Sequence, residues 1–451
     1  MSFFIKGKRS RGRGKAVENG DTIPNKKFKD DELTSSESEY DDKEDAEIES
    51  EEEEETAQEK RLRLAKIYLQ EIEKEEKERL EQNEGTDIVS HRLKEDYLKQ
   101  TGKFRSEVAD QYVKVELESI EVLRCKEHKK VVTCLCISSD NLYIFTGSKD
   151  GSIVQWSIGE RKKIGSIPFK RKNLVSVSST IDGHSFPITC IAISDDSKFL
   201  AAGDESNDIQ IWNPTNLTHI HTLKSHRNCV TGLVFRKDSH QLYSCSKDKS
   251  VKVWTLDEMA FLETLFGHQD CIMAIDALSR ERTVTAGGSD NSLRIWKVAE
   301  ESQLIFNGTG NLDCVKLINE EHFISAGDAG ELCIWGAMKK KPLCCVKDAH
   351  GSSVENGQPA WINCVASLVN TDLVASGSSD GSIRLWKVSN GCKSISPLFT
   401  IPITGFVNTM SFTSDGKYLI AGVGQEHRCG RWFTIKEARN GIVIIPLKKS
   451  S

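Results

Sequence analysis

Short apolar runs alternate with polar turns through the chain from about residue 118 onward. One stretch reads CVTGLVF, a turn at 237–239, QLYSCS, a second turn at 247–249, and then SVKVW. Short runs rich in β-branched residues predict strands, and turns that contain aspartate supply tight reversals between them. The pattern therefore predicts a domain built from antiparallel strands.

This unit of strands and turns recurs along the chain, and a tryptophan marks its end. Four copies share a spacing of 28 residues between a histidine and a tryptophan: His128 and Trp156, His184 and Trp212, His226 and Trp254, His268 and Trp296. An aspartate stands six residues before the tryptophan in four copies: Asp150, Asp248, Asp290 and Asp380. Two degenerate copies end at Trp335 and Trp432.

Seven copies result, and successive tryptophans at their ends are 39 to 56 residues apart, which is the period of a four-stranded propeller blade. The copies resemble WD40 repeats, which implies an all-β fold with a seven-bladed propeller over residues 118–451. The repeats lie near residues 128–158, 184–214, 226–256, 268–298, 310–337, 350–388 and 405–434. Aspartate follows the tryptophan in none of them, so the Trp-Asp-x-Arg box of WD40 proteins that dock onto cullin–RING ubiquitin ligases is absent.

Two segments are candidates for the outer strand of the last blade. Residues 120–128 match the outer strands that precede later blades, and residues 441–447 (GIVIIPL) also read as a strand. Closing the ring matters because an open propeller leaves unpaired strand edges. The pattern does not decide which segment closes blade seven, or whether both do.

The recurring polar residues predict a buried hydrogen-bond relay within the blades. Histidine pairs with the turn aspartate, a serine or threonine hydroxyl joins them, and the indole N–H of tryptophan is satisfied. The clearest sets are His226, Asp248, Trp254 and His268, Asp290, Trp296. A catalytic triad is the competing interpretation, but catalysis needs one such set and this chain repeats it. We expect no catalytic residues.

Basic loops interrupt the repeat in two informative places. The insertion after the first copy carries Lys170, Arg171 and Lys172, and the last copy replaces its usual turn with GVGQEHRCGRW. Clustered basic residues on loops hold phosphodiester backbones, and arginine can also stack on bases. The RNA-binding candidates are therefore Gln425, His427, Arg428, Arg431, Lys170, Arg171 and Lys172. The alternative is that these loops are simply solvated.

Charge is arranged in blocks at the N-terminus, although the whole chain carries a net charge of only −6. Residues 1–56 hold too few apolar side chains to offset the entropy of ordering, so we expect a disordered tail. Its basic residues predict a nuclear-import signal, with a solvated or RNA-touching tail as the alternative: Lys6, Lys8, Arg9, Arg11, Arg13 and Lys15. Ser36 and Ser38, each followed three positions later by an acidic residue, are candidate phosphorylation sites.

Residues 57–102 have helical periodicity. The first helix places Leu62, Ala65, Leu69 and Ile72 on one face, and a second, from about residue 87 to residue 100, does the same with Val89, Leu93 and Tyr97. A helix with only one narrow apolar stripe cannot fold alone. The stripes dock on the propeller or on a partner, and we favour the partner.

The cysteines and the rest of the sequence give no sign of a metal site, a disulfide framework or a membrane segment. The 14 cysteines include no Cys-x-x-Cys pair, so we expect free thiols that fill the core rather than a metal site or disulfides. Cys134, Cys190, Cys229, Cys271, Cys314 and Cys364 occupy equivalent repeat positions. No signal peptide or membrane span is visible, so we expect a soluble, intracellular protein with no cofactor and no small-molecule substrate.

Longer strings resemble one family more closely than the general repeat does. RLRLAKIYLQEIE, RLKEDYLKQTGK and FVNTMSFTSDGKYLIAGVGQEHRCGRWFTIKEARNGIVIIPL are similar to segments of the U3 small nucleolar RNA-interacting WD40 proteins. The resemblance implies binding to the box B/C region of U3 RNA beside the kink-turn-binding protein and other box C/D ribonucleoprotein subunits. It further implies a place in the nucleolar small-subunit processome and a role in early cleavages towards 18S rRNA.

Two other functions stay open at this point. One is a protein-only scaffold in a nuclear complex, and the other, weakened by the missing box, is a ubiquitin-ligase substrate receptor. The sequence does not decide which propeller face meets RNA, or whether residues 57–102 bind RNA or protein.

Overall fold

The computed structural model describes residues 61–63, 66, 67, 70, 86–170, 183–352 and 357–449. The chain divides into two compact units, Met1–Gly85 and Thr86–Ser451. In the first unit the described residues are helical. The expected tail, with its import signal and Ser36 and Ser38, lies outside the described residues.

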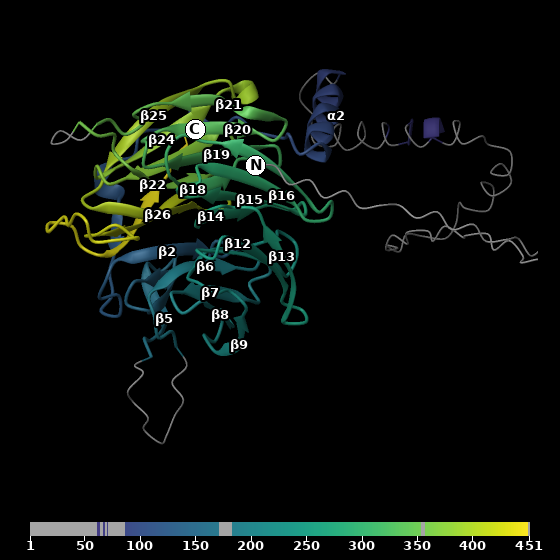
Figure 1. Ribbon diagram of the computed structural model, residues 1–451. Helices are drawn as coiled ribbons and strands as arrows, with labels where there is room; N and C mark the ends of the chain where they lie inside the picture. Colours follow the sequence, from purple (N-terminus) through teal and green to yellow (C-terminus); the bar gives the residue numbers. More distant parts are fainter. Residues whose placement is uncertain are drawn as a thin grey trace, which may run out of the picture. The chain divides into compact units, whose positions relative to one another are not determined.

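The second unit contains seven four-stranded antiparallel sheets, which are the blades of a propeller (Figure 1). The seven-bladed prediction is confirmed. Blade one consists of β2 (Val132–Ile137), β3 (Tyr143–Ser148), β4 (Ile153–Ser157) and β5 (Lys162–Ile167), and blade two of β6 (Ile188–Ile193), β7 (Leu200–Asp204), β8 (Asp208–Trp212) and β9 (His219–Lys224). Blade three consists of β10 (Val230–Phe235), β11 (Gln241–Ser246), β12 (Ser250–Thr255) and β13 (Ala260–Phe266), and blade four of β14 (Ile272–Ala277), β15 (Arg282–Gly287), β16 (Ser292–Lys297) and β17 (Ser302–Asn307).

Blades five and six follow the same order, and blade seven combines the two ends of the propeller. Blade five consists of β18 (Leu312–Leu317), β19 (His322–Gly327), β20 (Leu332–Gly336) and β21 (Lys339–Val346). Blade six consists of β22 (Ile362–Ser367), β23 (Leu373–Ser378), β24 (Ser382–Val388) and β25 (Ile395–Pro402). Blade seven consists of β26 (Phe406–Phe412), β27 (Tyr418–Gly424), β28 (Gly441–Pro446) and β1 (Glu121–Leu123). Both candidate segments close the ring, because β28 is the third strand of the blade and β1 pairs outside it, with Val122 opposite Val443.

Each blade begins with its innermost strand, and each of these strands carries a β-bulge near its start. The bulge residues are Thr133, Thr189, Thr231, Met273, Asp313, Asn363 and Asn408. In the first blades the bulge hydroxyl bonds to the next blade: Thr133 Oγ1 donates to the Ile188 carbonyl oxygen over 2.6 Å. In blades five to seven, acidic and amide side chains replace the threonines, which makes that side of the central channel more polar.

The two faces of the propeller are distinguished by their connections. Because strands alternate in direction, the turns between the first and second strands lie on one face. The turns between the second and third strands, and the links between blades, lie on the other. We call the second face the relay face, because the histidine–aspartate pairs lie there, and the first the strap face.

The strap face is partly covered by the segment that precedes the propeller. It contains α2 (Thr86–Gln100), η1 (Ala109–Gln111) and η2 (Leu117–Ser119). Asp372 Oδ1 accepts the Val108 and Ala109 amides over 2.8 and 2.9 Å, and the Tyr112 hydroxyl donates to the Gly416 carbonyl oxygen over 3.0 Å. This part of the chain therefore docks on blades six and seven.

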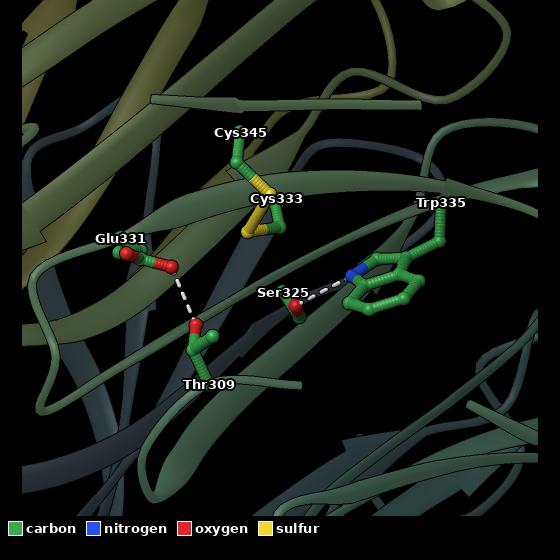
Figure 2. Close-up of a disulfide and its surroundings, with 6 residues drawn as sticks. All are labelled: Thr309, Ser325, Glu331, Cys333, Trp335 and Cys345. Atoms are coloured by element: carbon green, nitrogen blue, oxygen red, sulfur yellow. Dashed lines mark hydrogen bonds between the residues drawn. A yellow bond between two sulfur atoms is a disulfide. The ribbon is translucent and has the colours of Figure 1, made fainter. Parts of the chain in front are cut away.

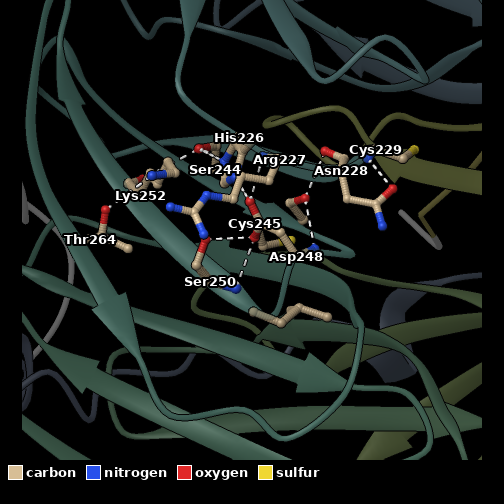
Figure 3. Close-up of polar contacts among 12 residues, drawn as sticks. His226, Arg227, Asn228, Cys229, Ser244, Cys245, Asp248, Ser250, Lys252 and Thr264 are labelled. Atoms are coloured by element: carbon tan, nitrogen blue, oxygen red, sulfur yellow. Dashed lines mark hydrogen bonds and ion pairs between the residues drawn. The ribbon is translucent and has the colours of Figure 1, made fainter.

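A polar relay of hydrogen bonds joins the strands and turns within individual blades. In blade three His226 Nδ1 contacts Asp248 Oδ2 at 2.8 Å and Nε2 contacts Ser244 Oγ at 2.7 Å (Figure 3), while the Trp254 indole donates to the same hydroxyl over 2.9 Å. His268, Asp290 and Trp296 repeat this around Thr285. A chain of hydrogen bonds from aspartate to histidine to hydroxyl to indole thus satisfies four polar groups in the blade.

The cysteines depart from expectation at one pair. Of the six repeat-position thiols, five are buried and Cys271 is partly exposed. Burial raises the pKa of Cys134 and Cys245 to about 12, so these thiols are chemically quiet. Cys333 and Cys345, however, form a disulfide between β20 and β21 (Figure 2), so the expectation that every cysteine is free was wrong. Strand register explains it, because the two residues are directly opposite each other.

The sequence predicts neither a membrane-spanning helix nor a metal site. None of the helices in the ranges that the structure describes is long and apolar enough to cross a membrane. Within those same ranges no cluster of histidine, cysteine, aspartate or glutamate is arranged to hold a metal ion.

Buried neutral histidines make the stability of the propeller dependent on pH. Burial lowers the pKa of His128 to about 4, and that of His427 falls to about 4 through burial and the charges of Arg428 and Lys149. The unfolded chain takes up these protons below about pH 6.5, whereas the folded chain does not until about pH 4. We therefore expect the free energy of unfolding to fall as the pH drops through this window, by about 1 kcal/mol per histidine at pH 5.5. Urea unfolding at pH 7.5 and 5.5 measures it, and an unchanged or higher midpoint at pH 5.5 would contradict this assignment.

Candidate nucleic-acid interface

One long departure from the repeat on the relay face is the loop between β27 and β28, residues 425–440. Its base is closed by Gln425, whose side-chain amide donates to the Ala438 carbonyl oxygen over 2.8 Å and whose backbone N–H donates to Asn440 Oδ1 over 3.1 Å. The sequence placed Gln425 among the RNA-binding candidates. In the structure its side chain closes the loop.

Arg428 reaches across the propeller. Its guanidinium Nη2 donates to the Asp313 carbonyl oxygen over 2.6 Å, so the side chain reaches from blade seven to the inner strand of blade five. Its backbone N–H donates to Asn408 Oδ1 over 2.9 Å. The residue as a whole keeps some exposure. These contacts hold the loop, and direct binding of RNA by Arg428 stays a prediction.

This role gives a prediction for Arg428→Ala. Loss of a charged hydrogen bond across the channel costs about 1.5–3 kcal/mol, and we expect much of it to appear as opening of the loop. Hydrogen exchange of the amides in residues 425–436 should accelerate about tenfold or more, while amides of β11 and β12 keep their protection. Arg431→Ala is the matched control because Arg431 is exposed. Equal exchange in both variants would contradict the role.

Beside Arg428 three rings form an aromatic cluster, which we define as Trp361, His427 and Trp432. The ring centroids of Trp361 and Trp432 are 5.8 Å apart, and that of His427 lies 6.1 Å from the first and 5.6 Å from the second. His427 is buried, whereas Trp432 is 59% exposed and Trp361 36%. Because its pKa is lowered to about 4, the imidazole is neutral near pH 7 and packs as a ring.

Charge and further aromatic surface surround this cluster. Arg431 is exposed and its Nε lies 2.6 Å from Glu426 Oε1, which leaves the other edge of the guanidinium open. Phe433 is 63% exposed. Exposed indole rings beside a positive charge can stack on bases and hold the backbone, because every base offers a flat π-face.

Trp361 was missed by the sequence reasoning. It precedes β22 and is the one tryptophan of eight that does not end a repeat copy. That irregularity was the available signal. The link that carries Trp361 and the loop that carries Trp432 both emerge on the relay face, which brings residues about 70 positions apart into contact.

The insertion between β5 and β6 also emerges on the relay face. The Lys170 backbone N–H donates to the His184 carbonyl oxygen over 2.9 Å, which closes the neck of the insertion. Lys170 is exposed, whereas Arg171 and Lys172 lie outside the described residues. The structure therefore places Lys170 on the same face as the aromatic cluster without joining the two.

Comparison with known proteins identifies the family. The WD domain, G-beta repeat model matches residues 119–157, 175–213, 217–255, 259–297 and 351–387. U3 small nucleolar RNA-interacting protein 2 of Mus musculus is 52% identical over 398 residues, which cover 87% of this chain and 83% of that protein. The chain belongs to the U3 small nucleolar RNA-interacting protein family. The resemblance drawn from the sequence is thereby confirmed.

A more distant relative and a solved structure extend the comparison. Ribosomal RNA-processing protein 9 of Saccharomyces cerevisiae is 27% identical over 549 residues, covering 94% of this chain and 96% of the yeast protein. The solved structure described as "Structure of U3-55K" superimposes with a TM-score of 0.71 and 49% identity, covering 74% of this chain and all of that one. The family fold is therefore the propeller described above.

Proposed function

We propose that this protein is a non-catalytic U3 small nucleolar RNA-binding component of the U3 ribonucleoprotein. The observation that carries the proposal is the aromatic cluster beside Arg431, because His427, Trp432 and Arg431 all lie on a loop that the WD40 fold does not need. Relatives named for interaction with U3 RNA and for ribosomal RNA processing support the choice of RNA. The fold and family both favour a scaffold over an enzyme.

We further propose that the bound element is the box B/C region of U3, where a small kink-turn-binding protein and other box C/D subunits assemble alongside. In this arrangement the relay face binds RNA, and the strap face is left free to bind small-subunit processome proteins. The protein then acts in the nucleolus and supports the early cleavages towards 18S rRNA. Local positive charge allows this despite the net charge of −6, since binding depends on the surface that meets the phosphates.

Ultraviolet crosslinking in cells tests the proposal. The protein is purified under denaturing conditions and the attached RNA is sequenced. We expect U3 to be enriched, with the crosslinks concentrated in box B/C. Recovery of U3 only under native conditions, with none crosslinked, would mean that a neighbour holds the RNA and that this chain is a protein-only scaffold.

A further inference from the structure

A basic hollow lies on the relay face, between blades one and two. Its volume is about 640 Å³. Three segments line it: the link before β2, the turn between β3 and β4, and the base of the insertion after β5. The residues used here are Lys126, Lys129, Lys130, Lys149 and Phe169.

The four lysines of this hollow carry charge that the protein itself does not neutralise. Among the described residues none of their ammonium groups is in an ion pair, and Lys126, Lys129 and Lys130 are exposed. The nearby acids are already engaged. Glu127 is paired with Lys163, and Asp150 accepts hydrogen bonds from the Lys129 backbone N–H over 2.6 Å and the Ser152 hydroxyl over 2.6 Å. The hollow is therefore suited to an anion.

Phe169 adds a rigid aromatic surface to this charge. Its ring lies against the turn at Gly151, where an added Cβ would stand 2.5 Å from Phe169 Cδ2 and where φ is +84°. Glycine is required there, so the ring is seated directly on the backbone. The hydrogen bond at the neck of the insertion fixes the next residue, Lys170. Even so, Phe169 stays 43% exposed, which is unusual for a ring held this firmly.

The hollow lies beside the loop that carries most of the proposed RNA site. The link before β2 packs against the base of that loop, where a Cβ added at Gly424 would stand 2.0 Å from Val131 Cγ2. An RNA strand that extends from the aromatic cluster can therefore reach the four lysines across the relay face. Phosphates spaced along a single strand fit several separated ammonium groups, and an exposed ring beside them fits a base.

We propose that this hollow, the Phe169 site, binds single-stranded RNA that flanks the folded element held by the aromatic cluster. Lys126, Lys129, Lys130 and Lys149 contact phosphates, and Phe169 stacks on one base. The assignment rests on the proposed RNA-binding function and adds to it a second, separable contact that reads no particular sequence.

The test uses the full-length protein and two RNAs, the U3 box B/C element alone and the same element extended by about ten unpaired uridines. We expect the extension to tighten binding by the wild type about tenfold or more. Phe169→Leu keeps an apolar cover on Gly151 but removes the stacking surface, so it should lose most of this gain and bind the unextended RNA normally. Lys126→Ala with Lys130→Ala should lower the salt dependence for the extended RNA by about 1.4 in log–log slope.

Lys339→Ala with Lys340→Ala, an exposed basic pair on β21, is the matched control and should keep the full gain. The proposal is overturned if the extension adds no affinity for the wild type, or if Phe169→Leu weakens both RNAs equally at an unchanged unfolding midpoint. A protein that binds neither RNA would instead refute the proposed function itself.

Discussion

Trp361→Ala combined with Trp432→Ala is expected to weaken binding of U3 box B/C RNA by about two orders of magnitude. The two indoles offer stacking surface on the relay face, and stacking of one base on an aromatic side chain contributes about 1–3 kcal/mol. Their centroids are 5.8 Å apart, so removing both opens the cluster and exposes the His427 ring that it covers. Titration of labelled RNA with the purified variant measures the loss.

Tyr97→Ala is the matched control for the double tryptophan variant. Tyr97 is 65% exposed on α2, which belongs to the segment that covers the strap face. We expect wild-type affinity from it. If the control loses as much affinity as the double variant, RNA meets the strap face, and the aromatic cluster is not the binding surface. Unfolding midpoints of all three proteins should agree closely, because Trp361 and Trp432 lie outside the blade cores.

The second large effect is expected in the blade interior. His226→Ala should lower the free energy of unfolding by about 3 kcal/mol, because it leaves the buried Ser244 and the partly buried Asp248 without the imidazole that joins them. Asp248→Ala should cost a comparable amount, and the double variant should cost much less than the sum, since both changes break one network. Urea unfolding gives the three values.

His240→Ala is a sharp control for the relay, because His240 also contacts two aspartates. Its ring nitrogens lie 2.8 Å from Asp196 and 2.5 Å from Asp257, and these carboxylates raise its pKa by accepting its hydrogen bonds. The site is partly exposed to solvent, so we expect a cost of about 1 kcal/mol or less. A loss equal to that of His226→Ala would show that burial of the relay is not what makes it stabilising.

Much of the fold was predictable because the repeat makes local and global signals agree. His226, Asp248 and Trp254 recur at fixed spacing in the clearest copies, and the tryptophan that ends every copy, including the degenerate ones, gives the blade count. The order of β28 and β1 in blade seven was not predictable, since both segments read as strands and only pairing distinguishes them. The Cys333–Cys345 pair likewise depends on the register of β20 and β21, which apolar periodicity does not specify.

The candidate site was only partly visible in the sequence. The irregular last blade drew attention to residues 425–431, but a cluster of basic residues in the sequence does not reveal where each side chain points. Arg428 turns inward to the backbone carbonyl oxygen of Asp313, and the Asn408 side chain, which stands where the first blades have threonine, accepts its backbone N–H. Trp361 lies far from the loop in sequence, and only the closed ring brings it to Trp432.

The most direct test of the account is to crosslink purified full-length protein to U3 box B/C RNA with ultraviolet light and identify the modified peptides by mass spectrometry. We expect nucleotide adducts on the peptides that contain Trp361 and residues 429–434, and also on the peptide that contains Phe169 when the RNA carries an unpaired extension. Adducts confined to residues 86–119 or to the strap-face turns would contradict it, because the relay face would then be free of RNA.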